Sequence, residues 1–325
     1  MNTFRLLLLL VILISTPAAA CVWTYGTAID GSEMGIDGAQ TLEDAISSYL
    51  YELRTSPDRT QSIREDSAEL ARQLLHDSDY KLRNDYAVSL MRLGHFQRAL
   101  ELLQGIEREK PGLYETASNI GTVYELLGRN DSALHWISEG VRRNPDSHEG
   151  TEWLHERILQ AKLALERDSS WSRHNTVLGL DFGSDSLPAN PRGYPGSIIQ
   201  LYDVAIAIKY QLSERLLFVK PPDPIAADLL VDLGNVLALT DVLQIAVEVY
   251  ELALQYRPAN PELIRRRIAA LNAIIAANPP STEPSGVHAS DYGILYVVLG
   301  SIGMIGLGVG GTLGVQRIRR RRVSG

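Results

Sequence analysis

The chain has 325 residues, of which 45% are apolar and 22% are charged, and its formal net charge is −8. The apolar content excludes a largely disordered protein, and the length suffices for one large or two small domains with buried cores. The acidic balance argues against a nucleic-acid partner, and the single cysteine excludes a disulfide framework within the chain.

Residues 1–20 have the pattern of a secretory signal peptide. Arg5 supplies the positive charge, an apolar run extends from Leu6 to Ile14, and three alanines precede the expected cleavage point. Cys21 follows directly, in an arrangement that resembles the bacterial lipobox. Two outcomes are therefore open, lipidation of Cys21 or ordinary cleavage before it, and an uncleaved anchor is a third alternative.

The segment 21–79 is expected to begin irregularly and then to become helical. Residues 22–40 contain four glycines and lack a helical period, which favours an irregular, partly packed entry segment. Helical patterns are predicted from Thr41 to about Ser56 and from about Gln61 to His76.

Residues 80–147 contain two consecutive copies of a 34-residue pattern. Three pairs of landmark residues are 34 positions apart, namely Gly94 and Gly128, Ala99 and Ala133, and Pro111 and Pro145. A glycine permits a tight turn between antiparallel helices, an alanine lets the helices approach closely, and a proline ends the second helix. A single long helix is predicted next, from Ser147 to about Glu166, as a cap on the pair, so that this unit spans 80–166.

This pattern resembles the tetratricopeptide repeat. The resemblance implies an all-α fold, a solenoid of stacked helical hairpins whose first helices line a concave groove for a peptide or partner helix. By repeat register the groove-facing residues are Asn84, Val88, Arg92, Ser118, Thr122 and Glu125. An ordinary solvated helix face is the alternative. Some grooves of this family clamp a terminal carboxylate with asparagine and lysine, but Val88 stands where one such asparagine would be.

Residues 167–197 are rich in Ser, Gly, Pro and Asn and are predicted to be a linker, with a short extended piece from Val177 to Phe182. Helical patterns return over 198–279. A helix from Pro261 to Ala277 is predicted to cap this part, with Arg265 to Arg267 in solvent.

A third tetratricopeptide-like unit is predicted within this part, at 227–260. Its offset of 113 residues from the second copy is not a multiple of 34, which indicates an insertion between the copies. The matching residues are Leu233, Gly234, Ala246 and Tyr250 for Ile120, Gly121, Ala133 and Ile137.

The C-terminal part has the pattern of a membrane anchor. A polar spacer at 280–291 precedes 24 uncharged residues at 292–315, and the tail 316–325 contains five arginines. The uncharged run is long enough for a transmembrane helix, with a buried core helix as the alternative, and the arginines predict a cytoplasmic tail. Self-association is compatible with three glycines at four-residue spacing, Gly306, Gly310 and Gly314.

Motifs for nucleotide binding, metalloprotease, serine-hydrolase and haem chemistry are absent from the sequence. One cluster at helical spacing could hold a metal, and it consists of His148, Glu152, His155 and Glu156. A solvated or hydrogen-bonded capping surface is the favoured interpretation, so neither a metal nor a cofactor is expected. The stretches 147–162 and 219–235 also resemble uncharacterised bacterial proteins with a signal peptide and tetratricopeptide repeats, a resemblance that implies no activity.

These patterns together predict a single-pass protein of the cell membrane whose repeats are periplasmic or extracellular. Its expected function is that of a protein–protein interaction scaffold and not of an enzyme. The alternative is an enzyme or metal-dependent module centred on residues 148–235, with the helices as its framework.

Overall fold

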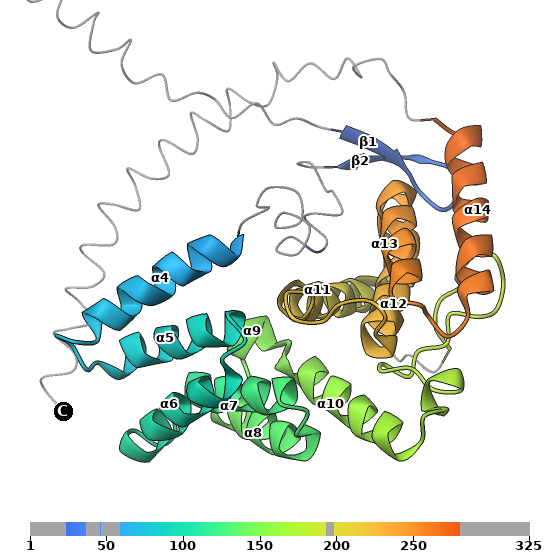
Figure 1. Cartoon of the computed structure of the whole chain (residues 1–325). Helices are drawn as coiled ribbons and strands as arrows, with labels where there is room; N and C mark the ends of the chain where they lie inside the picture. The colour runs from blue at the N-terminus through green and yellow to red at the C-terminus, as the bar shows by residue number, and fades with distance from the viewer. Residues whose placement is uncertain (1–23, 37–45, 47–58, 193–197, 280–325) are drawn as a thin grey trace, which may run out of the picture. The chain divides into compact units, whose positions relative to one another are not determined.

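The computed structural model describes residues 24–36, 46, 59–192 and 198–279 (Figure 1). The predicted signal peptide, Cys21, the membrane-anchor segment and the basic tail lie outside these residues, as does the predicted helix at 41–56 apart from Ile46. Within the described ranges, no helix has the length and apolar character needed to cross a membrane. The described chain is helical except for one two-stranded hairpin and irregular connections, which confirms a predominantly α-helical fold.

The helices follow one another in the order drawn in Figure 1. The first group is α4 (Arg59–Gln73), α5 (Tyr80–Arg92), α6 (Phe96–Glu109), α7 (Tyr114–Leu126) and α8 (Asn130–Arg143). The second group is α9 (Ser147–Gly150), α10 (Glu152–Arg167), the 3-10 helix η1 (Trp171–Arg173), α11 (Ile198–Arg215), α12 (Pro224–Thr240), α13 (Leu243–Gln255) and α14 (Pro261–Ala277).

The pairs α5–α6 and α7–α8 are helical hairpins with equivalent turns. Gly94 and Gly128 have φ angles of 81° and 71°, in the left-handed region that favours glycine. The Gly94 amide donates to the carbonyl of Met91, and the Gly128 amide donates to that of Glu125, again 34 positions on. These bonds satisfy carbonyls that a helix end leaves without partners. The turns therefore lie where the 34-residue spacing predicts them.

The pair α12–α13 shares the close helix crossing of α7–α8. A Cβ atom at Gly121 would lie 2.7 Å from the side chain of Ile137, and one at Gly234 would lie 2.5 Å from the ring of Tyr250. These are the pairs that the 113-residue offset matches. The turns differ, because the residue after α12 is Asp241, with φ −140°, and not a left-handed glycine.

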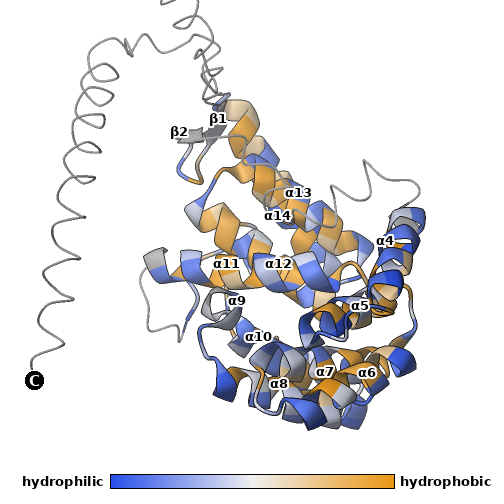
Figure 2. Ribbon diagram, turned by 90° about the vertical axis from the view of Figure 1, so that its left-hand side faces the viewer, coloured by the Kyte–Doolittle hydropathy of each residue, from blue (hydrophilic) through white to orange (hydrophobic). Residues whose placement is uncertain are grey.

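The largest core cluster is formed mainly by α10 to α14, and a second one is formed mainly by α5, α6 and α7. Figure 2 shows extended apolar stretches on α13 and α14. Helix α12 is buried on almost all sides, with buried residues from Ile225 to Ala238, as expected for a helix that is apolar around its whole circumference. The buried polar residues of α12, Asp232 and Asn235, are therefore exceptions on an apolar helix.

Part of the segment predicted to be irregular is a β-hairpin. Strands β1 (Thr24–Thr27) and β2 (Glu33–Ile36) pair antiparallel. The hairpin is held by tertiary contacts. The Thr27 amide donates to Gln244 Oε1 at 3.2 Å, and the Thr27 hydroxyl donates to the Asn278 carbonyl at 2.9 Å. A side chain at Gly26 would collide with Val242. The local prediction was wrong here because these partners lie more than 200 residues away.

The long helix predicted from Ser147 is broken. It is divided into α9 and α10 at Gly150, which has φ 72°, and Thr151. His148 has φ 52°, a conformation that is uncommon for a residue other than glycine. The break turns the His148 side chain toward the face of α10 that carries Glu152.

The segment 167–192 packs as part of the core and is not a free linker. Val177 and Phe182 are buried in it, and Asp181 pairs with Arg192 in an isolated β-bridge. The prediction that Arg267 is solvated is wrong, because only 1% of it is exposed. Its guanidinium donates to Asn235 Oδ1 and to carbonyls of this segment, which replace the water that a solvated arginine would bind.

Candidate functional site

A pocket of about 290 Å³ lies among α5, α7, α9–α10 and α11. Most of the predicted groove residues line it, namely Val88, Arg92, Ser118, Thr122 and Glu125. Asn84 does not; its side-chain oxygen accepts a hydrogen bond from the Asn119 amide at 2.9 Å. Helix α11 supplies Tyr210, Gln211, Glu214 and Arg215 to the wall, so the helix insertion covers part of the predicted groove. The structure brings these residues together, and their role in partner binding stays a prediction.

Glu125 is the centre of the charged network in this pocket, although its side chain is only 5% exposed. The carboxylate lies 2.6 Å from Lys162 Nζ, 2.8 Å from His155 Nε2 and 3.2 Å from Arg215 Nη2, and Arg215 Nη1 makes a further contact. Burial alone would raise the pKa of Glu125, but the charge of Arg215, the hydrogen bond from His155 and the charge of Lys162 hold that pKa well below its ordinary value. Glu125 is therefore a carboxylate anchored by cations from α10 and α11.

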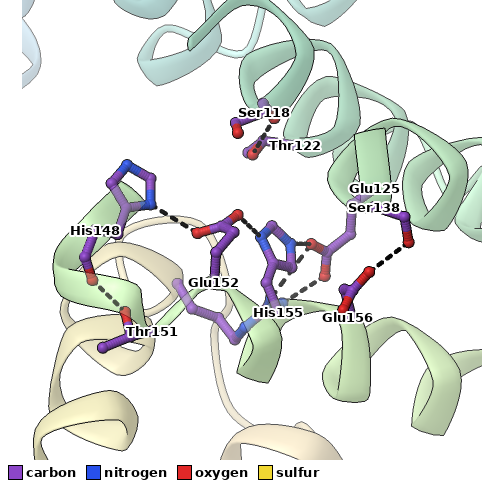
Figure 3. A network of polar contacts seen from close by, with 10 residues as sticks. Ser118, Thr122, Glu125, Ser138, His148, Thr151, Glu152, His155 and Glu156 are labelled. Carbon is purple, nitrogen blue, oxygen red and sulfur yellow. Dashed lines mark hydrogen bonds and ion pairs between the residues drawn. The ribbon is translucent and has the colours of Figure 1, made fainter. Parts of the chain in front are cut away.

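His155 lies between two carboxylates (Figure 3). Its Nε2 faces Glu125 Oε2 at 2.8 Å and its Nδ1 faces Glu152 Oε1 at 3.1 Å. Ionised carboxylates only accept hydrogen bonds, so this position favours the imidazolium form, in which both ring nitrogens donate. Burial would lower the pKa of His155, but the bonds and charges of Glu125 and Glu152 outweigh burial and raise it.

His148 extends the network toward solvent. Its Nδ1 lies 2.7 Å from Glu152 Oε2, its side chain is 34% exposed, and its ring stacks on Tyr210 with 5.0 Å between centroids. The hydrogen bond that His148 donates to Glu152 is the main cause that raises the pKa of His148. Burial would raise the pKa of Glu152, but the bonds from His148 and His155 lower it to about 2. The left-handed backbone of His148 is thus held in place by a charged contact and a ring contact.

Two buried polar atoms on residues that line the pocket have no hydrogen-bond partner among the described residues. They are Ser118 Oγ and Arg215 Nε. Buried polar atoms in folded proteins nearly always have a partner, and an exception calls for an explanation such as a bound group. A ligand that carries both an acceptor and a donor would satisfy these two atoms.

The cluster proposed from helical spacing is only partly united. His148, Glu152 and His155 bond to one another, but Glu156 turns to α8 and accepts from Ser138 Oγ at 2.5 Å (Figure 3). In the described part of the chain, no group of three or more His, Cys, Asp or Glu side chains is arranged to hold a metal ion. His148, Glu152 and His155 form a hydrogen-bonded network, of which Glu152 and His155 are buried.

Sequence reasoning missed Lys162 and Arg215 as members of this site. Arg215 is 90 residues from Glu125 along the chain, and it lies beyond a segment that was expected to be a linker. No periodicity relates α11 to the two repeats, so a local pattern gives no signal.

No protein-family model matches the chain, and a comparison with curated proteins finds no matching sequence. The resemblance to tetratricopeptide repeats therefore rests on residue spacing and on the form of the helical hairpins. Function has to be argued from the pocket itself.

Stability is expected to fall as pH rises above about 6.5. A histidine whose pKa is raised by folding stabilises the fold fully below its ordinary pKa of about 6.5 and loses that contribution as pH rises through the folded value. His155 and His148 are both of this kind. Urea unfolding of the full chain in detergent, at pH 6 and at pH 8.5, measures the effect. The variant His155→Gln should show a smaller difference between the two pH values, and an unchanged difference would contradict the assignment of the imidazolium.

Proposed function

We propose that the protein is a membrane-tethered, extracytoplasmic interaction scaffold of the tetratricopeptide type, which binds a short segment of a partner protein. The observation that carries this proposal is the pocket on the inner face of α5 and α7, where buried polar atoms of Ser118 and Arg215 lack partners. The helix hairpins at 34-residue spacing support the family type.

The size and lining of the pocket define the segment that it would hold. About 290 Å³ is room for one or two side chains and not for a long extended peptide. Met91, Leu126 and Phe218 provide apolar wall, which suits an apolar side chain. The backbone of the bound segment would accept from Arg215 Nε and interact with Ser118 Oγ. Since α11 covers part of the predicted groove, binding is restricted to this opening.

The membrane tether in this proposal is supported by the sequence alone, through the signal-like segment 1–20 and the uncharged segment 292–315. Both lie outside the described residues. Lipidation of Cys21 and self-association through Gly306, Gly310 and Gly314 remain predictions of the same kind.

A peptide-binding experiment tests the pocket and the topology together. Peptides are first selected from a random library on the purified full chain in detergent. A selected, labelled peptide should bind the full chain, should lose binding at least tenfold in Val88→Trp, which fills the pocket, and should be unaffected by Glu101→Ala on the exposed face of α6. Failure to select a peptide, or binding that is indifferent to Val88→Trp, contradicts the scaffold.

The same peptide is then added to intact spheroplasts that contain the full chain. Binding from outside is expected if the repeats are extracytoplasmic. Binding that appears only after lysis would contradict the proposed orientation and leave the scaffold itself in place.

A further inference from the structure

A second and larger cavity, of about 560 Å³, lies between α12, α14 and the packed segment that follows α10. Trp171, Leu180 and Leu263 provide apolar lining. Its polar lining includes two carboxyl groups of α12, Asp228 and Asp232. Residues four apart on a helix lie on the same face, so both carboxyl groups belong to the wall that α12 presents to this cavity, together with Asn235.

Asp232 is an unusual residue for this environment. Only 2% of it is exposed, and its Oδ2 atom is buried without a hydrogen-bond partner among the described residues. Asp228 Oδ2 accepts from the Val177 amide at 2.6 Å. A buried carboxyl oxygen without a partner costs stability, and packing of the apolar residues does not explain that cost.

The cations nearby do not neutralise this pair by contact. Arg267 is buried, and its guanidinium donates to Asn235 Oδ1 and to the carbonyls of Gly183 and Phe182. Arg173, on the cavity wall, is exposed. Among the described residues, the ion pairs include none that joins Asp228 or Asp232 to a lysine, arginine or histidine. The cavity therefore contains two acidic groups and no cation bound to either.

We propose that this cavity binds a small molecule that carries a primary ammonium group. The ammonium would donate to Asp232 Oδ2 and to the Asp228 carboxyl, and its positive charge would compensate theirs. An alkyl chain on the ligand would lie against Trp171, Leu180 and Leu263, which are apolar lining residues. The ligand class follows from the missing donor at Asp232 Oδ2, from the lack of an ion pair to either carboxyl group among the described residues, and from the apolar wall.

The raised pKa values of Asp228 and Asp232 agree with this inference. Burial raises the pKa of Asp228 to about 6, and burial together with the charge of Asp228 raises that of Asp232 well above its ordinary value. The other titratable or charged groups around them are Arg173, His174 and Asp181 of the packed segment, Arg267 of α14 and Tyr250 of α13. The raised pKa values show that burial disfavours the charged form of both carboxyl groups, and a bound ammonium group would favour that form.

Calorimetric titration of the full chain in detergent with cadaverine, in amine-free buffer at pH 7.5, tests the proposal. Cadaverine should bind, while 1,5-pentanediol, which has hydroxyl groups in place of the amines, should not. Asp232→Asn should weaken cadaverine binding at least tenfold. Asp203→Asn, at an exposed position on α11, is the matched control and should leave the affinity unchanged. Affinity should fall when the pH is lowered to 5, because protons then compete for the carboxyl pair.

The melting temperature of Asp232→Asn shows whether this variant has lost the binding site or the whole fold. It removes a buried acidic group, so its melting temperature should equal or exceed that of the natural chain. Four results would each overturn the proposal. They are absence of cadaverine binding, equal binding of the diol, full binding by Asp232→Asn, and displacement of cadaverine by Mg²⁺ or Ca²⁺. Val88→Trp should not affect cadaverine binding, so this site and the peptide pocket can fail independently.

Discussion

Replacing Glu125 by glutamine is expected to destabilise the fold by about 3–5 kcal/mol, because it leaves buried cations without their anion. Arg215, His155 and Lys162 all contact this carboxylate. Glutamine retains the shape of glutamate, so the change removes charge and little volume. Urea unfolding of the full chain in detergent, followed by circular dichroism, measures the difference in the free energy of unfolding.

Glu115→Gln provides the matched control, since Glu115 is on the same helix, α7, and is exposed. Its effect should stay within about 0.5 kcal/mol. Adding Arg215→Met to Glu125→Gln should recover part of the lost stability, because the second change removes one of the unpaired cations. If Glu125→Gln differed from Glu115→Gln by less than about 1 kcal/mol, the network would not hold α11 against the repeats.

Replacing Gly234 by alanine is expected to destabilise the fold by about 1–3 kcal/mol, through overpacking of the crossing between α12 and α13. The new Cβ atom would lie 2.5 Å from two ring carbons of Tyr250. Tyr250 is fully buried, and its hydroxyl donates to Asn235 Oδ1 at 2.7 Å. The ring therefore has no free direction in which to move. The same unfolding measurement applies.

Gly105→Ala is the control for this change. Gly105 is also within a helix, α6, but a Cβ there would meet only the end of the Arg108 side chain, at 3.9 Å. Alanine is the better helix former, so this variant should gain about 0.5–1 kcal/mol. Two glycine-to-alanine changes of opposite sign would establish the close crossing, and a stabilising Gly234→Ala would show that the helices are further apart.

Much of the helical framework could be predicted from spacing, because its causes are local. Gly94 and Gly128 are needed for left-handed turns, and Gly121 is needed where Ile137 crosses. The same pattern, displaced by 113 residues, matches Gly234 and Tyr250 to Gly121 and Ile137, and the structure places Gly234 against Tyr250. A left-handed turn or a close helix crossing requires glycine at one particular position, and this requirement is visible in a single sequence. The membrane helix, the signal peptide and Cys21 lie outside the described residues and stay predictions.

The site depended on contacts that local patterns do not encode. The register placed Val88, Ser118 and Glu125 on one face, but only the tertiary structure brings Arg215 to Glu125. The interior position of Arg267 was likewise decided by carbonyls of a segment whose composition suggested a linker. A charge can be buried only where distant groups replace its water, and the sequence does not reveal which groups those are. Most helix positions were thus determined by the sequence itself, although the break at Gly150 was not. The partners of buried charges were decided by the packing of α11 and α14, since electrostatic compensation is a property of neighbours in space.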